Sequence, residues 1–299
     1  MTVSDEAIER LRRLGDRPDF CGTRYDLAEE IGRGGMGLVF RARDRELDRD
    51  VAVKVTTWRT ASDADRLQRE ARTLASLEHP GIVPIHDVGR LADGRVFLVM
   101  GLVRGARLDA HAERLPLADR LRLFDRVCDT VAFAHARGVV HRDLKPANIM
   151  VGPFGQVQIL DWGLAGLTEP GGTDGYMAPE QSTQNIDARA DVYALGAILA
   201  GLASEGGWHL SGKGASHLSP GLRPLRSIVA RATGHDPDSR YPGVAELAAD
   251  VRRFADGEAV QAHRETVLER IARLARLYRT PLVLMLTYLL VRLLLLLAT

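Results

Sequence analysis

The sequence has few cysteines, no excess charge of either sign and no apolar stretch at its start. Cys21 and Cys128 are the only cysteines among 299 residues, and they lie far apart. Neither a disulfide framework nor a zinc site is therefore predicted. The 40 basic and 39 acidic residues give a formal net charge of +1. This balance argues against a surface designed for nucleic acid.

The first 22 residues read as a short polar leader without the apolar run of a signal peptide. Export of most of the chain is therefore not expected, and a reducing, cytoplasmic setting follows. No internal repeat is present. The length exceeds that of one usual compact domain, so the chain should form a two-lobed domain or one domain with appendages.

Three short segments with a strand pattern predict an antiparallel meander in the N-terminal third, and two short apolar runs complete the sheet. These segments are residues 25–31, 38–43, 51–55, 82–88 and 96–101. Ser62 and Asp63 are candidate caps for one helix within this part. The period becomes helical over residues 117–136, and helices dominate beyond residue 186. The second part should therefore be mostly α.

Gly32, Gly34 and Gly37 have the GxGxxG spacing found in several nucleotide-binding loops. A dinucleotide fold needs a helix directly after the last glycine, so that its N-terminus meets the pyrophosphate. Here residues 38–40 continue as a strand, so the loop joins two strands. Glycine allows a backbone to approach phosphates closely, but a purely structural turn stays an alternative at this point.

Charged residues in two further segments are candidates for chemistry. Lys54 lies in the apolar strand DVAVKV, where its stem would be buried and Glu70 on the next helix is the natural partner. Two exposed charges are the alternative. Residues 139–151, VVHRDLKPANIMV, group His, Arg, Asp, Lys and Asn between apolar runs. A solvated loop is the plain interpretation of that segment by itself.

Taken in order, GRGGMGLV, VAVK, Glu70, HRDLKPAN, DWG and APE resemble the signature set of eukaryotic-type Ser/Thr protein kinases, especially bacterial ones. The resemblance spans residues 24–256. It implies an α+β, bilobal protein kinase fold, with an antiparallel β N-lobe carrying one main helix and a mostly α C-lobe. We expect the kinase domain over residues 23–258, with the N-lobe at 23–102 and the C-lobe at 103–258.

The resemblance implies transfer of the γ-phosphate of MgATP to protein Ser or Thr hydroxyls, autophosphorylation included, with Mn²⁺ as a substitute metal. Asp143 would orient the substrate hydroxyl and Lys145 would steady the γ-phosphate. The implied catalytic residues are Asp143, Lys145, Lys54 and Glu70, and the implied metal ligands are Asn148 and Asp161. The implied ATP-binding residues are Ile31, Gly32, Gly34, Gly35, Gly37, Val39, Ala52, Lys54, Met100, Val103 and Met150.

Three features bear on regulation and substrate range. Trp162 replaces the usual Phe, which could alter the balance between active and inactive loop positions. Thr168 is either a regulatory phosphosite or part of a loop ordered without phosphate. The segment between Leu202 and Leu222 is short and rich in Gly and Ser, so a helix that often docks protein substrates is missing or shrunken.

By the same resemblance, Glu180 and Arg240 should form an ion pair that holds the substrate-side loop to the last helices. An ordinary charged surface pair is the alternative. His141 is expected to be a packed scaffold residue rather than a catalytic one.

Residues 281–299 carry one charge, Arg292, and as a helix would reach about 28 Å, close to the thickness of a bilayer core. We expect a single-pass transmembrane helix here, with a buried core helix as the alternative. The preceding residues 259–280 form a basic amphipathic juxtamembrane pattern that should lie on anionic lipid and keep the kinase domain cytoplasmic. A solvated or coiled-coil linker is the alternative there.

Two other functions remain open for the whole chain. A non-catalytic scaffold would bind nucleotide or partners without turnover, and a small-molecule kinase would use a related fold. The expected partners are protein substrates and a membrane, with no nucleic acid and with a homodimer as an option.

Overall fold

The computed structural model describes residues 17–34, 37–56, 68–69, 71–162, 175–182, 186–204, 222–267, 269–271, 273, 278, 283–289 and 291–292. These residues divide into two compact units. The first contains residues 17–111 and 133–162, and the second contains 112–132 and the described residues from 175 onward.

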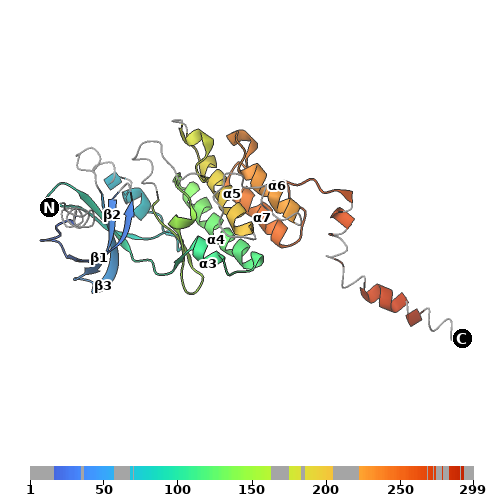
Figure 1. The fold of residues 1–299 in the computed structure, drawn as a ribbon, viewed down its shortest axis with the longest axis horizontal. Helices are drawn as coiled ribbons and strands as arrows, with labels where there is room; N and C mark the ends of the chain where they lie inside the picture. The colour runs from blue at the N-terminus through green and yellow to red at the C-terminus, as the bar shows by residue number, and fades with distance from the viewer. Residues whose placement is uncertain are drawn as a thin grey trace, which may run out of the picture. The chain divides into compact units, whose positions relative to one another are not determined.

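The first unit is built on a five-stranded antiparallel sheet with the strand order β1-β2-β3-β5-β4. Figure 1 shows β1, β2 and β3 side by side. Strand β4 begins after Pro84, because proline has no N–H to contribute to a ladder, and Ile82 forms only an isolated bridge with Ile159. The strands are β1 Tyr25–Gly34, β2 Gly37–Asp44, β3 Arg49–Thr56, β4 Ile85–Arg90 and β5 Val96–Gly101.

The two faces of this sheet have different roles. Val39 lies opposite Lys54, and Ala52 lies opposite Met100. Residues directly opposite or two apart on a strand share a face, so these four side chains belong to one face. The other face carries the hydrophobic core: Phe20, Tyr25, Leu38, Phe40, Ala42, Val51, Val53, Val55, Leu91, Phe97 and Val99.

This core extends into the predicted polar leader. Phe20 is buried, and its ring centroid lies 5.0 Å from that of Phe97 on β5. Thr23 donates its backbone N–H to the carbonyl of Phe20. The hydrophobic core of the first unit therefore includes Phe20.

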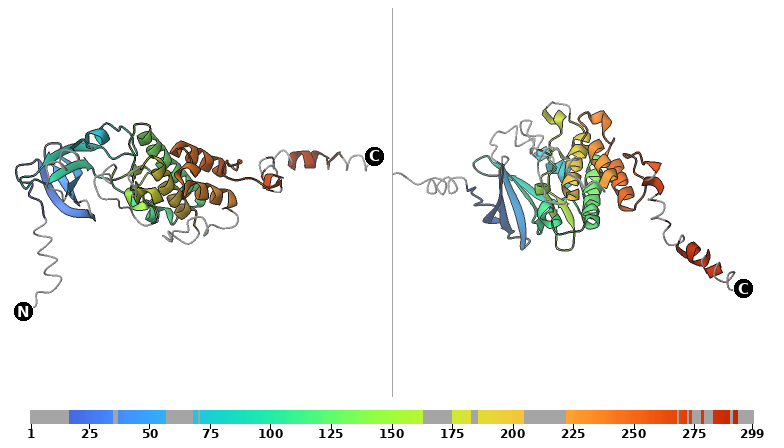
Figure 2. Two further views of the ribbon diagram at one scale, coloured as in Figure 1. Left: turned by 90° about the horizontal axis from the view of Figure 1, so that it is seen from above. Right: turned by 45° about the vertical axis from the view of Figure 1, so that its right-hand side comes forward.

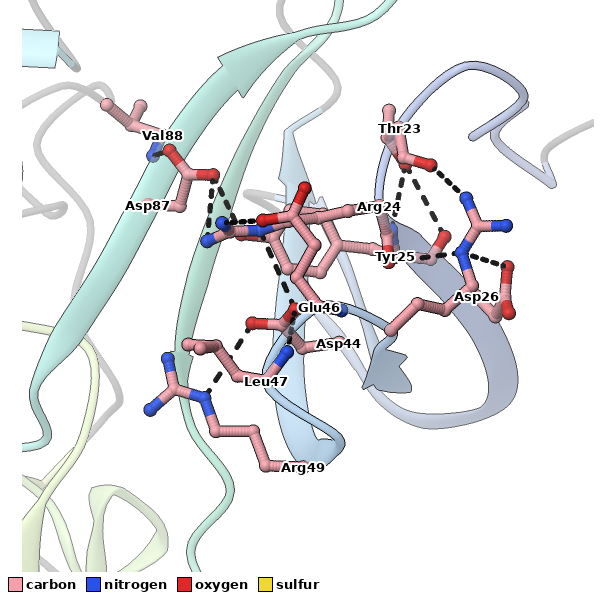
Figure 3. Close-up of polar contacts among 11 residues, drawn as sticks. Thr23, Arg24, Tyr25, Asp26, Asp44, Glu46, Leu47, Arg49, Asp87 and Val88 are labelled. Carbon is pink, nitrogen blue, oxygen red and sulfur yellow. Dashed lines mark hydrogen bonds and ion pairs between the residues drawn. The ribbon is translucent and has the colours of Figure 1, made fainter.

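A network of polar side chains connects the turn between β2 and β3 with the start of β1 and with β4 (Figure 3). Arg24 lies 2.8 Å from Glu46 and 3.6 Å from the buried Asp44. Asp44 accepts the backbone N–H of Glu46, and Tyr25 donates its hydroxyl to Asp87 at 2.7 Å. Burial and this bond raise the pKa of Tyr25 to about 12. These contacts hold the start of β1, the β2–β3 turn and β4 together.

Residues 133–162 belong to the first unit. Ile159 donates its backbone N–H to Gly81 at 2.8 Å, and His79 packs on Phe133 with ring centroids 4.7 Å apart. A second, three-stranded sheet with the order β6-β7-β8 carries this segment. Its strands are β6 Ala106–Arg107, β7 Ile149–Val151 and β8 Val157–Ile159, and the short 3-10 helix η1 Pro146–Asn148 directly precedes β7.

The second unit is helical, as the periodicity predicts. Its central helix α5 is buried along most of its length. A Cβ at Gly196 would lie 2.7 Å from that of Ala232, so glycine lets α5 and α6 approach closely. Both views of Figure 2 keep these yellow and orange helices together. The helices are α3 Leu108–Ala112 and α4 Leu117–His135, which both cross the unit boundary, then η3 Pro179–Ser182, α5 Arg189–Ala203, α6 Arg223–Ala232, η5 Pro237–Ser239 and α7 Val244–Ala255.

The second unit continues past residue 258, the predicted end of the domain. The fully buried carboxylate of Asp250 on α7 accepts the backbone N–H groups of Gln261 at 2.6 Å and Ala262 at 3.0 Å. Val260 is buried as well. The start of the predicted juxtamembrane segment is therefore hydrogen-bonded to α7.

The next residues begin a helix through a reciprocal cap. Thr266 donates its backbone N–H to the carboxylate of Glu269 at 2.9 Å, and Glu269 donates its backbone N–H to the Thr266 hydroxyl. Of the predicted membrane helix, residues 283–289 and 291–292 are helical, and the rest lies outside the described residues. Within the described part of the chain, no helix has both the length and the apolar character needed to cross a membrane.

Candidate active site

Lys54 projects from β3 on the sheet face opposite the hydrophobic core. Its side chain is buried, and its Nζ lies 2.7 Å from Oδ1 of Asp161. A buried ammonium group needs such a partner, because an unpaired charge in the protein interior is costly. The predicted partner, Glu70, lies outside the described residues. The structure therefore pairs the lysine with a predicted metal ligand.

Asp161 follows β8 in an unusual backbone conformation. Its φ is 59°, in the left-handed region that residues with a Cβ rarely adopt. The preceding residue is held, because Leu160 donates its backbone N–H to the carbonyl of Asn148 at 2.8 Å. The Asp161 side chain is 39% exposed, so it can accept further ligands while it contacts Lys54.

The segment HRDLKPAN folds so that Asp143 lies between Lys145 and Asn148. The Lys145 Nζ is 2.8 Å from Oδ2 of Asp143. The Asn148 amide nitrogen donates to the Asp143 carbonyl at 2.8 Å and to its Oδ2 at 3.2 Å. These contacts orient the Asp143 carboxylate, as a base that accepts a hydroxyl proton requires.

Local sequence explains this shape. Pro146 occupies the start of η1, where its missing N–H costs nothing and its fixed φ suits a helical turn. Asn148 closes the turn by donating its backbone N–H to the Lys145 carbonyl at 2.9 Å, and it is buried. The turn thus brings Lys145 and Asn148 onto the same carboxylate.

His141 is a scaffold residue of this loop. It is fully buried, and its Nε2 lies 2.8 Å from the carbonyl of Leu160. A carbonyl can only accept, so Nε2 carries the proton. The backbone N–H of Asp143 donates to Nδ1 at 3.3 Å. His141 therefore links the loop that carries Asp143 to the strand end that carries Asp161.

Asn148 and Asp161 fit a hard divalent cation. Because the Asn148 amide nitrogen is directed at Asp143, its amide oxygen is the atom that would serve as a ligand, together with the Asp161 carboxylate. Mg²⁺ is commonly held by one or two such protein groups together with substrate phosphates. Among the described residues, no group of three or more His, Cys, Asp or Glu could hold a metal ion.

The glycines of the first hairpin differ in what they do. A Cβ at Gly37, whose φ is 145°, would lie 2.1 Å from the carbonyl oxygen of Val55. Glycine is thus required there for β2 to approach β3. A Cβ at Gly34 would meet no atom within 4 Å. Packing therefore explains Gly37, whereas Gly34 suits a backbone that must stay open to a ligand. Gly35 lies outside the described residues.

The remaining predicted ATP-binding residues are spread over several strands of the first unit. Val39, Ala52 and Met100 share the sheet face of Lys54. Each of these three except Ala52 is partly exposed. The other predicted positions are the exposed Ile31 and partly exposed Gly32 on β1, Val103 just after β5, and Met150 on β7.

The second unit contains the ion pair predicted between Glu180 and Arg240. The guanidinium donates to both carboxylate oxygens at 2.6 and 2.7 Å. It also donates to the backbone carbonyls of Gly234 and Arg189. Burial alone would raise the pKa of Glu180, but the hydrogen bonds from Arg240, a backbone hydrogen bond and the Arg240 charge together outweigh it and hold this pKa below its ordinary value. The pair is buried rather than a surface contact.

Comparison with known proteins identifies the fold family. The sequence model of the protein kinase domain matches residues 25–255. This chain belongs to the protein kinase family. The serine/threonine-protein kinase PknB of Mycolicibacterium smegmatis is 34% identical to it over 303 residues, covering 86% of this chain and 47% of the relative. The PknB of Mycobacterium tuberculosis is 34% identical over 288 residues, with coverages of 82% and 45%.

A third relative is the DNA damage-responsive serine/threonine-protein kinase RqkA of Deinococcus radiodurans. It is 41% identical over 196 residues, which cover 59% of this kinase and 29% of the relative. This kinase thus spans about half the length, or less, of the curated relatives it matches.

Among solved structures, the PknI kinase domain of Mycobacterium tuberculosis superposes with a TM-score of 0.64 at 28% identity. The match covers 77% of this kinase and 96% of that domain. The fold is therefore the bilobal protein kinase fold, with an antiparallel sheet in the N-lobe and helices in the C-lobe. Membership of this family implies the use of ATP and a divalent metal in general.

Proposed function

We propose that this kinase transfers the γ-phosphate of MgATP to Ser or Thr hydroxyls of proteins, its own chain included, in signalling close to a membrane. The observation that carries the proposal is two sets of polar contacts within one unit. Lys54 contacts Asp161 at 2.7 Å, and Asp143 contacts Lys145 at 2.8 Å and Asn148 at 2.8 Å. Phosphoryl transfer depends chiefly on such positioning and charge neutralisation.

Each residue has a defined task in this proposal. The substrate hydroxyl transfers its proton to the Asp143 carboxylate as its oxygen attacks the γ-phosphorus and the bond to the leaving ADP oxygen breaks. Lys145 keeps a positive charge beside this attack, and Lys54 keeps another beside Asp161. A divalent ion bound by Asn148 and Asp161 would supply neutralisation of the phosphate charge.

Replacement of Asp143 tests the proposal. The purified chain is incubated with MgATP and a Ser/Thr-containing protein, and phosphate incorporation is measured. Asp143→Asn removes the proton acceptor at nearly constant shape, so the rate should fall about 10²- to 10⁴-fold. Asp129→Asn is the matched control, because Asp129 is 60% exposed on α4 and makes only a 3.5 Å contact to Arg252.

The outcomes separate the competing functions. A wild-type chain that binds ATP without transferring phosphate is a non-catalytic scaffold. Equal rates for wild type and Asp143→Asn overturn the assigned chemistry. Transfer to a small molecule but to no protein, the chain itself included, identifies a small-molecule kinase instead.

We further propose that the C-terminal segment anchors the kinase to a membrane, with the kinase domain on the cytoplasmic side. Support comes from the helical residues 283–289. The apolar side chains there are between 51% and 66% exposed and occupy every position except Thr287, so they occur on every side of the helix. Such a helix is favoured in lipid, where apolar surface is removed from water. The apolar residues are Val283, Leu284, Met285, Leu286, Tyr288 and Leu289.

Flotation with lipid vesicles tests the anchor. The full chain and a chain ending at Tyr278 are mixed with vesicles of phosphatidylcholine and phosphatidylglycerol. This endpoint keeps the hydrogen bonds of Asp250 to residues 261 and 262 and the ion pair of Glu265 with Arg273 at 2.7 Å. The folded part of the chain should therefore be preserved. The full chain should float at high salt and the shorter chain should not. Equal behaviour of the two chains would rule out anchoring by residues 279–299.

A further inference from the structure

Trp162 directly follows Asp161 and is hydrogen-bonded as well as packed. Its side chain is only 4% exposed. The indole Nε1–H donates to the backbone carbonyl of Ile159 at 2.9 Å, and the bond is buried. A buried hydrogen bond of this kind is costly to leave unmade, since the carbonyl would lose its partner without gaining water.

This bond spans a residue whose backbone conformation is unfavourable. Ile159 precedes Asp161 by two positions, and Trp162 follows it, so the indole bond closes a short loop around Asp161. Inside that loop, Asp161 has a φ of 59°. A residue with a Cβ persists in this region only when its surroundings hold it there. The Trp162 bond is one such restraint, and the Lys54 contact at 2.7 Å is another.

The ring of Trp162 also connects this loop to the catalytic segment. Its centroid lies 4.9 Å from that of His141, at an interplanar angle of 54°. His141 in turn holds the carbonyl of Leu160 at 2.8 Å and accepts the backbone N–H of Asp143. Consecutive carbonyls of Ile159 and Leu160 are thus each held by a buried ring. The backbone that leads into Asp161 has little freedom to rotate.

We propose that Trp162 is a positioning residue, which uses its indole N–H bond to Ile159 to hold the Asp161 carboxylate in the orientation that binds the metal of MgATP. The inference rests on the proposed phosphotransfer, because it concerns a predicted ligand of that reaction. A phenylalanine at this position could fill similar space, but it has no N–H to donate. The oriented state of Asp161 should therefore be populated before ATP or metal binds.

Two replacements separate the hydrogen bond from the packing. Trp162→Phe removes the donor and part of the ring. Replacement of Trp162 by β-(3-benzothienyl)alanine removes only the donor, because sulfur takes the place of N–H in a ring of almost the same shape. Initial rates at saturating ATP are measured against free Mg²⁺. A buried hydrogen bond of ordinary net strength corresponds to about a 3- to 10-fold change in an equilibrium.

Both replacements should therefore raise the Mg²⁺ concentration for half-maximal rate about 3- to 10-fold, while the rate at saturating Mg²⁺ changes less. Val127→Ala is the control for general destabilisation. Val127 is fully buried on α4, and this change should lower the melting temperature without shifting the Mg²⁺ dependence. If the benzothienyl protein shows wild-type Mg²⁺ dependence, the hydrogen bond does not position Asp161 and the proposal is overturned.

A second measurement needs no turnover. The chain contains three tryptophans, and Trp162→Phe identifies the Trp162 indole resonance by its disappearance from a ¹⁵N spectrum. In the free wild-type kinase this N–H should exchange with solvent about 100-fold or more slowly than in a free indole. Unprotected exchange would overturn the proposal even in an active kinase. A protected N–H in a wild-type chain that transfers no phosphate would instead show that the proposed function fails while the bond persists.

Discussion

Two ion pairs in this kinase are built in contrasting ways. Lys54 and Asp161 share a single contact of 2.7 Å, and the Asp161 side chain is 39% exposed. Arg240 and Glu180 share two contacts of 2.6 and 2.7 Å, and the Arg240 side chain is 0% exposed. In the first pair, the partly exposed Asp161 carboxylate can still bind a ligand. In the second, which we call the saturated pair, both carboxylate oxygens of Glu180 are hydrogen-bonded to the guanidinium. A pair that takes part in chemistry must be able to change partners, and a pair that holds the fold must not.

Removal of one partner from the saturated pair should have the largest effect on stability. Glu180→Ala leaves the Arg240 charge buried without its carboxylate, with only backbone carbonyls such as those of Gly234 and Arg189 to contact. Breaking a buried pair in this way costs about 3–5 kcal/mol. We expect that loss in the free energy of unfolding, measured by urea denaturation monitored by circular dichroism.

An exposed pair in the first unit supplies the matched control. Arg41 and Glu29 lie 3.0 Å apart with 45% and 58% of their side chains exposed. Arg41→Ala should cost less than about 1 kcal/mol, because solvent screens both charges. If Glu180→Ala and Arg41→Ala cost the same, burial does not distinguish structural ion pairs in this kinase.

Lys54→Met should slow phosphate transfer strongly but change stability little, whereas Glu180→Ala should cause a large loss of stability. Methionine keeps much of the apolar stem but removes the charge beside Asp161, so phosphate transfer should slow about 10²- to 10³-fold, or about 2.7–4 kcal/mol in the barrier. Stability should change by less than about 1 kcal/mol, because the released Asp161 carboxylate is partly solvated and tolerates loss of its partner.

The two quantities are measured on the same preparation, as kcat/KM for a peptide substrate and as the urea midpoint. A Lys54→Met protein that transfers phosphate at the wild-type rate would remove Lys54 from the site. One that loses several kcal/mol of stability would show that the Lys54–Asp161 pair is structural, like Glu180–Arg240.

The strands of the first sheet, and the position of Lys54 on one of them, could be predicted from residue patterns. Alternation placed Lys54 on a strand with an apolar surround, and the register places Val39 and Met100 on the same face. Within HRDLKPAN, the short turn Pro146–Asn148 brings the Asn148 amide to Asp143. Such predictions succeed because a strand or tight turn determines the side-chain direction locally.

Contacts that form only when the folded backbone brings two groups together leave no comparable signal in the sequence. Asp250 is recognisable as an acidic residue on a helix, but its partners are backbone N–H groups of Gln261 and Ala262, which no residue type marks. Trp162 is visible as a substitution, yet its acceptor at Ile159 depends on the left-handed backbone of Asp161. Phe20 lies in a segment that reads as a polar leader, because one aromatic residue does not establish a pattern. Tertiary contacts decide all three cases.

Acid should weaken the saturated pair without any mutation. The folded pKa of Glu180 lies below its ordinary value of 4.5, so its ionised form stabilises the folded state. For a carboxylate with a depressed pKa, this contribution is complete above the unfolded pKa and is lost as the pH falls through the folded pKa. Other carboxylates titrate in the same range, so wild type alone cannot isolate Glu180.

The difference in unfolding free energy between wild type and Glu180→Ala isolates it, because the variant lacks only this titrating group. We expect the difference to stay constant from about pH 7 down to about pH 5, above the ordinary carboxylate range, and to shrink progressively at lower pH. A difference that grows with acid would mean that the folded pKa of Glu180 is raised. In that case the hydrogen bonds from Arg240 do not compensate the cost of burying the Glu180 carboxylate, and the contrast with Lys54–Asp161 rests on burial alone.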